Sequence, residues 1–418
     1  GGHLMLEGKI IKFYRELKNM TQKELGDGIC SGTHVSKIER GLTEVSDETI
    51  QFLADRLQID IQNEMNLYRN VELLLRKWEE AIIMKLDVKT ETIKKQLEQI
   101  PLLQIPDFYR IHTLLLTRYY ILTEQRKKTE TLLQEMEKWT ELSHREQSML
   151  VHIKGIYGLQ MKHDYYEAID LLKQVDPTYY NNPEYYYHMA VAYHSTNSRV
   201  LSYYYASKAL SFFEKSHCYA RVIETEMLML IQIEQEPTSG PQNEKYIELI
   251  EMCENFGLEK QKALLLHNFG YHSILHGHFE DACQYYKESM QLKDPSTSNY
   301  LGSLEGYVNA ATLLGKEPAT NILQLAEKGL KTARENGSTT FVHFFQMHIY
   351  RLKKQDDKYY EYLETELYPH LKKLGYVLPA EHYEIILFDF YNKNGDAERA
   401  NEYAKFIADK NRRTNQFV

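Results

Sequence analysis

The polar side chains best placed for recognition chemistry lie between residues 33 and 40. Within this stretch Val35 and Ile38 are three positions apart, so on a helix both are expected to face inward. The remaining positions form an exposed face that carries hydroxyl, imidazole and cationic groups: Thr33, His34, Ser36, Lys37 and Arg40. Short polar and long cationic side chains on one helix face can reach base edges, so this pattern is suited to binding nucleic acid.

Four histidines form the one cluster with the composition of a metal site: His267, His272, His276 and His278. Two imidazoles four positions apart on a helix can chelate zinc. However, the stretch from His276 to His278 has the features of a helix-to-helix turn, where polar residues are expected, and no cysteine or carboxylate has a spacing that completes four ligands. The sequence therefore favours neither a metal nor another cofactor. It also lacks the P-loop, GxSxG and HExxH motifs, so no enzymatic activity is predicted.

Composition limits the elements that can position these residues. A chain of 418 residues is too long for one ordinary domain, which predicts two domains or an extended repeat array. The 43% of hydrophobic residues indicates a folded protein, and only 20 glycines and 10 prolines favour an all-α fold. The net charge of −9 argues against a protein that coats nucleic acid or an anionic membrane, so any contact with DNA is expected to be local.

The cysteine content and the hydropathy pattern predict a cytoplasmic protein. The four cysteines include no CxxC pair and are too few to staple a chain of this length. No run approaches the roughly 18 apolar residues of a membrane span, and no export signal is apparent, so no membrane partner is expected. Residues 1–4, ahead of Met5, have the appearance of a remnant of recombinant expression and are left out of the fold.

Four helices are predicted within residues 5–62. Thr21 and Glu24 form a capping box, so the second helix should begin at Gln22. The third should begin at Gly32 or Thr33 and stop before Gly41. The first helix is expected from Leu6 to about Leu17, with its inward face formed by Ile10, Ile11, Phe13, Tyr14 and Leu17, and the fourth from the cap Ser46 through Ile50, Leu53 and Leu57.

This arrangement resembles the lambda-repressor-like, or Xre-type, helix-turn-helix family over residues 8 to about 60. The resembling motifs are Gly8-Lys9-Ile10, Met20-Thr21-Gln22-Lys23-Glu24-Leu25, Val35-Ser36-Lys37-Ile38-Glu39-Arg40-Gly41, and Ser46 through Leu57. The resemblance implies that Gln22 binds a phosphate and that Thr33, His34, Ser36 and Lys37 face the major groove, with Arg40 on the same exposed side. A helix amino terminus favours a phosphate on physical grounds as well.

Local charge is consistent with DNA binding, although a helical protein–protein module on the same scaffold is the alternative. Residues 9–40 contain seven basic and four acidic side chains, whereas residues 41–69 contain two basic and six acidic ones. The positive potential therefore lies where the DNA-facing surface is expected. One domain with so few basic residues should bind weakly at physiological salt, which predicts a homodimer on an operator with two half-sites.

Residues 73–418 are predicted to form an array of helical hairpins, preceded by a helical linker over residues 63–72. The stretch from Leu264 to Pro295 looks like a tetratricopeptide repeat, with small residues such as Gly270 where helices approach closely and rings such as Tyr286 where they interlock. Ala168, Ala282 and Ala400 recur at separations of 114 and 118 residues, or about three repeats each. The predicted array is a right-handed α-solenoid of about nine hairpins. Three lie around the three alanines, and the others are placed at 72–100, 108–140, 183–214, 218–256, 298–334 and 339–374. Pro237–Pro241 should be an exposed turn.

A helix-turn-helix followed by such an array resembles the peptide-responsive quorum-sensing regulators of Gram-positive bacteria, the group containing Rap, NprR, PlcR, PrgX and Rgg. The size and the number of hairpins are most similar to NprR-like and PlcR-like members. The resemblance implies a cytoplasmic, dimeric transcription regulator that binds a short signalling peptide in the groove of its array.

Candidate peptide-binding residues follow from repeat geometry, because the first helix of each hairpin lines the concave side of such an array. An asparagine there can donate to and accept from a peptide backbone. The resemblance carries this role to Asn268, to Asn309 41 residues later, and to Gln346 37 residues further on. Tyr271 and His267 are expected companions. Equivalent placement adds Tyr187, with Lys154 and Arg118 as cations for a peptide carboxylate. Alternatively, Asn309 merely satisfies a helix–helix contact.

A different function remains open from the sequence. As in the Rap-like members of the group, the array could be a docking scaffold for a response regulator or another protein partner, inhibited by peptide. The complete helix-turn-helix favours DNA as the target.

Overall fold

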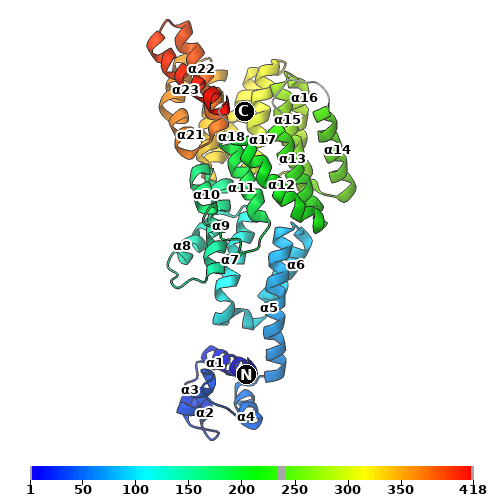
Figure 1. Ribbon diagram of the computed structural model, residues 1–418, viewed down its shortest axis with the longest axis vertical. Helices are drawn as coiled ribbons and strands as arrows, with labels where there is room; N and C mark the ends of the chain where they lie inside the picture. The colour runs from blue at the N-terminus through cyan, green and yellow to red at the C-terminus, as the bar shows by residue number, and fades with distance from the viewer. Residues whose placement is uncertain (1, 234–240, 416–418) are drawn as a thin grey trace. The chain divides into compact units, whose positions relative to one another are not determined.

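The computed structural model describes residues 2–233 and 241–415, with side chains over 6–233 and 244–410, and all of its regular secondary structure is helical (Figure 1). It divides into two compact units, residues 1–140 and residues 141–418. No helix among the described residues is long and apolar enough to cross a membrane.

The first unit begins with the four predicted short helices. They are α1 (Gly2–Leu17), α2 (Gln22–Gly26), α3 (Gly32–Glu39) and α4 (Asp47–Leu57). The capping box is confirmed, because Thr21 Oγ1 accepts from the Glu24 amide while the Thr21 amide donates to Glu24 Oε2. Ser46 caps α4 as predicted. The two residues expected to face inward on α3, Val35 and Ile38, are fully buried.

The inward face of α1 is only partly as predicted. Ile10 and Ile11 are fully buried and Tyr14 nearly so, but the side chain of Leu17 is 58% exposed. Leu17 is the last residue of α1, where the chain turns away through Asn19 in a left-handed conformation, so no neighbouring helix covers it.

A single helix carries the chain from this small domain into the hairpins. Helix α5 (Ile61–Ile83) spans the predicted linker of residues 63–72 without a break, and Ile61 and Met65 near its start are buried. Tyr14 Oη donates to Glu64 Oε2 at 2.7 Å, which ties α1 to α5. The unit continues through α6 (Asp87–Glu98), a 3₁₀ turn (Pro101–Gln104), α7 (Pro106–Leu122) and α8 (Arg126–Met136).

The second unit consists of consecutive helical hairpins. Its helices are α9 (His144–Tyr157) with a π-turn (Gly158–Lys162), α10 (Tyr165–Leu172), α11 (Glu184–Ser195), α12 (Arg199–Lys215), α13 (Tyr219–Ile233), α14 (Pro241–Phe256), α15 (Glu259–Leu275), α16 (Phe279–Gln291), α17 (Ser298–Leu314), α18 (Ala319–Glu335), α19 (Thr339–Leu352), α20 (Asp356–Tyr362) with a π-turn (Leu363–Leu367), α21 (Tyr368–Leu374), α22 (Val377–Lys393) and α23 (Ala397–Asn415). Counting α5/α6 and α7/α8, the described helices form nine hairpins, as predicted. The predicted turn at Pro237–Pro241 lies outside the described residues, apart from Pro241, where α14 begins.

Glycines and rings hold neighbouring helices together as the repeat pattern predicts. A Cβ atom at Gly270 on α15 or at Gly306 on α17 would lie 2.9 Å or 2.3 Å from the ring of Tyr286 on α16. Tyr286 therefore fills the seam between three helices, and neither glycine can be enlarged without moving a buried ring. In the same way, a Cβ atom at Gly329 of α18 would lie 2.5 Å from the ring of Phe345 on α19.

The first helices of successive hairpins lie side by side. Helix α11 contacts α13, α13 contacts α15, α15 contacts α17, and α17 contacts α19. This neighbour pattern is the one that places first helices along one wall of an α-solenoid. The side chains that these helices direct away from the seams therefore share one surface.

Candidate functional site

The first candidate site is a depression of about 440 Å³ where the amino ends of α2 and α3 meet. It is polar and is lined by Thr21, Gln22, Lys23, Gly32, Thr33 and Ser36. Ser31 caps α3 through its hydroxyl and Thr21 caps α2, so both helix starts face this side of the domain. The arrangement presents backbone dipoles, hydroxyl groups and an exposed lysine together, which suits an anionic partner.

The predicted recognition residues all lie on the accessible side of α3 or at its end. Thr33, Lys37 and Arg40 are exposed, while His34 and Ser36 are partly exposed. The guanidinium of Arg40 folds back along the helix, since its Nε donates to Ser36 O at 3.2 Å. The structure therefore brings five predicted side chains onto one face next to the depression.

Gln22 differs from the others because its side chain, although it lines the depression, also bonds to a buried carboxylate of the domain. Its Nε2 donates to Glu39 Oε2 at 2.8 Å. Arg15 also binds Glu39, with 2.5 Å from Nε to Oε1 and 3.1 Å from Nη2 to Oε2. The bond to Glu39 raises the pKa of Arg15, so this cation is ionised at neutral pH. No local sequence pattern indicates this network, because its three members lie on different helices.

The second candidate site is a row of side chains along the first helices of the second unit. Met227, Asn268, Asn309 and Arg351 follow one another at intervals of 41, 41 and 42 residues, on α13, α15, α17 and α19. Asn268 Nδ2 lies 3.1 Å from Met227 Sδ, and Arg351 Nη1 donates to Asn309 Oδ1 at 3.4 Å. The two predicted asparagines thus occupy equivalent places in adjacent repeats.

Beyond Asn309, the row continues through Arg351. Gln346 lies five residues earlier on α19, and at 100° per residue that turns its side chain about 140° away from Arg351. Gln346 is partly exposed. Gln346 follows Asn309 by 37 residues, whereas Arg351 follows it by 42. This difference in interval explains why the two side chains leave α19 in different directions.

Tyr271, one turn after Asn268, lies near charged side chains. Its side chain is 53% exposed, yet burial by surrounding protein raises its pKa, with the carboxylate of Glu305 adding to the increase. Arg199 on α12, which is itself half-buried, acts in the opposite direction and lowers the pKa of Tyr271.

Glu305 also contributes to the pKa of two other tyrosines. Burial raises the pKa of Tyr376 to about 12 and that of Tyr383 well above its usual value, and Glu305 contributes to both. His348 Nε2 lies 2.7 Å from Glu305 Oε1. Glu305 is four residues before Asn309 on α17, so the two share a helix face one turn apart.

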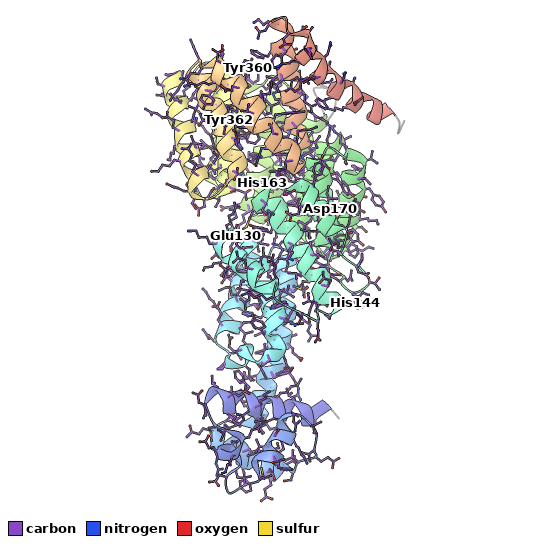
Figure 2. The ribbon with its side chains drawn as sticks, turned by 90° about the vertical axis from the view of Figure 1, so that its left-hand side faces the viewer. Glu130, His144, His163, Asp170, Tyr360 and Tyr362 are labelled. Carbon is purple, nitrogen blue, oxygen red and sulfur yellow. The ribbon has the colours of Figure 1, made fainter. Side chains whose placement is uncertain are left out.

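Within the second unit, contacts between residues distant in sequence join the region of α10–α12 to the region of α19–α22. The ring of Tyr165, at the start of α10, lies 5.0 Å from that of Tyr376, which precedes α22. His163, labelled in Figure 2, ends the π-turn before α10 and lies edge-on to Phe341 of α19 at 5.9 Å. In addition, Asn197 Nδ2 donates to Glu381 Oε2 at 3.1 Å across 184 residues of sequence. These contacts tie the two regions of the second unit together.

The other predicted peptide-binding residues lie in different surroundings. His267 turns into the seam of its hairpin, with Nδ1 3.0 Å from Ser303 Oγ, and burial lowers its pKa to about 3. The ring of Tyr187 covers the guanidinium of Arg221 at 5.4 Å. Lys154 on α9 is partly exposed, and Arg118 belongs to the first unit, where it is 5% exposed.

The histidine cluster does not form a metal site in the part of the chain that the structure describes. The rings of His272 and His276 lie 4.2 Å apart, and His276 Nδ1 is 2.8 Å from the backbone oxygen of His272. Within the described residues, no three histidine, cysteine or carboxylate side chains are grouped so that they could hold an ion. Gly277 has a φ of 75° and forms the predicted turn between α15 and α16.

Comparison with known proteins confirms the predicted domain and the predicted fold class. The family model described as helix-turn-helix matches residues 11–62. A Rap protein complexed with Competence and Sporulation Factor has a TM-score of 0.66 and 16% sequence identity, over 83% of this chain and 99% of that one. NprR in complex with its cognate peptide NprX has a TM-score of 0.63 and 22% identity, over 81% and 98% of the two chains.

A third solved structure, the apo form of the quorum sensor NprR from B. thuringiensis, has a TM-score of 0.53 and 20% identity, over 82% of this chain and 99% of that one. No curated protein sequence matches this chain. The predicted resemblance to the Rap and NprR group is therefore confirmed: the chain has a helix-turn-helix domain, and its helical hairpins have the fold of those quorum-sensing proteins.

Proposed function

We propose that this chain is a cytoplasmic DNA-binding regulator whose repeat array takes up a short signalling peptide. The observation that carries the DNA-binding part is the polar face of α3 beside the depression at the start of α2, within a segment that matches the helix-turn-helix family. The hydroxyls of Thr33 and Ser36 and the ammonium of Lys37 supply the donors and acceptors that base edges require.

The peptide-binding part rests on the asparagine row and the charged side chains beside it. Asn268 and Asn309 place amide groups 41 residues apart on neighbouring first helices, which suits a ligand with a repeating backbone. Arg351 and Glu305 add one cation and one anion next to Asn309. Rap and NprR structures of the same fold hold Competence and Sporulation Factor and NprX, which supports a peptide as the ligand here.

A homodimer joined through the array completes the proposal. Only Lys23, Lys37 and Arg40 add exposed positive charge to the α2–α3 face, so one domain should hold DNA weakly at physiological salt. Two domains on two half-sites would compensate. Light scattering at micromolar concentration should give the mass of a dimer, and a strict monomer both with and without DNA would contradict this step.

A gel-shift assay with genomic fragments tests the regulator proposal. The full chain should retard a subset of fragments, and short synthetic peptides from the reading frame directly downstream of the gene should change that retardation. Thr33→Ala in the same assay is the matched variant, because it removes one hydroxyl from the α3 face without touching the buried core. A chain that retards no fragment in either condition would instead favour the docking scaffold for a protein partner.

A further inference from the structure

A row of stacked aromatic rings lies on the surface where α11 packs against α12. The rings of Tyr193 and Tyr205 are 5.7 Å apart and nearly parallel, and the ring of Tyr186 follows 6.5 Å from that of Tyr205. Phe212 continues the row, with its ring 5.9 Å from that of Tyr186 and at 12° to it. All four side chains are partly or largely exposed. They form a ring ladder that alternates between the two helices, in which each ring covers part of the face of the next.

Helix α12 carries apolar side chains on its uncovered side as well as on its covered side. The residues that it packs into the array are small apart from one ring: Ser202, Ala206, Ala209 and Phe213. On the uncovered side, Val200 is 80% exposed, Leu201 44%, Tyr204 49% and Phe212 40%. A single exposed apolar residue is ordinary, but a contiguous exposed apolar face is typical of a surface that binds a partner.

Two cations without a carboxylate partner accompany the ring ladder. Lys208 Nζ lies 4.6 Å from the ring centre of Tyr204 and 5.5 Å from that of Tyr186. Lys173, an exposed residue at the end of α10, acts on Tyr205 together with Lys208, and both lower the pKa of this tyrosine, which burial raises. Among the described residues, neither lysine forms an ion pair. This part of the surface is therefore positive, in a chain whose net charge is −9.

We propose that the ring ladder and the uncovered side of α12 form a docking surface for an acidic, partly apolar segment of a partner protein. The carboxylates of such a segment would pair with Lys208 and Lys173. Its apolar side chains would cover Val200, Leu201 and Phe212. The edges of aromatic rings carry the positive side of the ring quadrupole, so a row of stacked rings also favours carboxylate oxygens over cations. The surface is separate from the polar face of α3 and from the asparagine row.

Two other occupants fit this surface less well. Duplex DNA carries about one negative charge per 1.7 Å, so two lysines along four rings would neutralise few phosphates. Exposed Val200 and Leu201 would gain nothing from phosphate groups. A second copy of this chain that docked through the same face would bring the two Lys208 side chains towards each other, because Lys208 lies near the middle of the uncovered side of α12. Like charges oppose such a contact.

Peptide selection on the full chain tests this inference. Random peptides of about 12 residues, displayed on phage, are first depleted on the Lys208→Glu chain and then selected on the wild-type chain. Depletion removes peptides that bind elsewhere, including those that bind the asparagine row, because these surfaces are the same in both chains. The surviving peptides should be rich in aspartate and glutamate and should also contain leucine, isoleucine or phenylalanine.

A synthetic copy of one selected peptide then measures the contribution of each side chain by fluorescence anisotropy. Lys208→Glu should weaken binding about tenfold or more, and Phe212→Ser about fivefold, because one change removes a charge pair and the other an apolar contact. Lys208→Arg keeps the charge and should retain binding within about threefold. Lys331→Glu is the matched control, since Lys331 is an exposed lysine on the second helix of a different hairpin, and it should change the affinity less than about twofold. All four side-chain changes lie at the surface, so the melting curves should match that of the wild type.

Three results would overturn the inference. The first is a selection that yields no peptide dependent on Lys208, or only peptides without acidic residues. The second is a smaller assembly for Lys208→Glu than for the wild type in light scattering, which would assign the face to a contact between copies. The third is weaker binding of a non-operator duplex by Lys208→Glu than by Lys331→Glu, which would assign the face to nucleic acid. The proposed regulation of DNA binding by peptide would stand in each case.

Discussion

Replacing Arg221 with methionine should destabilise the second unit by about 3–5 kcal/mol, because it leaves buried carboxylates without a cation. Arg221 on α13 and Glu184 on α11 are each 1% exposed, and Glu224 is 3% exposed. The guanidinium donates to Glu184 and, at 3.2 Å, to Glu224. Gln261 donates to the other oxygen of Glu224 at 3.1 Å, so the cluster links α11, α13 and α15.

Urea denaturation of the full chain, followed by circular dichroism, measures the effect. A loss of this size corresponds to a midpoint lower by about 1 M or more when the urea dependence is about 3 kcal/mol/M. Lys215→Met is the control, since Lys215 is an exposed cation at the end of α12 and its loss should cost less than about 0.5 kcal/mol. Adding Glu184→Gln to the Arg221→Met background should restore part of the stability.

The reasoning would be refuted by an Arg221→Met midpoint equal to that of Lys215→Met. Such a result would mean that Glu184 and Glu224 are hydrated or protonated without cost, and that the ion pairs do not hold these three helices together. A double variant no more stable than Arg221→Met would contradict the narrower claim that an uncompensated carboxylate causes the loss.

Three other perturbations have defined outcomes. Thr33→Ala and Lys37→Ala together should abolish retention of specific operators in gel shifts with an unchanged melting curve, and wild-type affinity would contradict the assignment of α3. Asn268→Ala or Asn309→Ala should each lower the calorimetric affinity for the regulatory peptide about tenfold, similarly for peptides of different side chains, because a lost backbone contact costs about 1–3 kcal/mol. Burial lowers the pKa of His267 to about 3, below the 6.5 of an unfolded histidine, so the unfolded state binds the extra proton. Stability should therefore fall as the pH decreases below about 6.5, and His267→Gln should reduce that fall in urea melts at pH 7 and pH 5.

Much of the fold follows from local sequence signals. Thr21 with Glu24 and Ser46 mark helix starts because a cap depends on residues within one turn. Gly270 and Tyr286 identified the hairpin of α15 and α16 because a missing Cβ and a large ring can pair where two helices approach closely. Repetition of such signals along the chain was sufficient to predict nine hairpins.

The candidate sites were less accessible to sequence reasoning, because they depend on contacts between distant repeats. The bond of Glu39 to Gln22 joins the end of one helix to the start of another, and no local pattern marks it. Arg351 could have been found, since it follows Asn309 by the same interval of about 41 residues that separates Asn309 from Asn268. The exposure of Leu17 reflects its position as the last residue of α1, where the chain turns away, and periodicity alone does not show this.

Peptide-dependent DNA binding by the full chain is the measurement that tests the account most directly. Fluorescence anisotropy of a labelled selected operator, titrated with the wild-type chain at fixed salt, should show saturable binding that a short synthetic peptide from the downstream reading frame shifts. The same peptide should leave the binding curve of Asn309→Ala largely unshifted at concentrations that saturate the wild type. An operator curve that no such peptide moves would contradict regulation through the array, and the absence of saturable binding by the wild type would contradict the DNA-binding function itself.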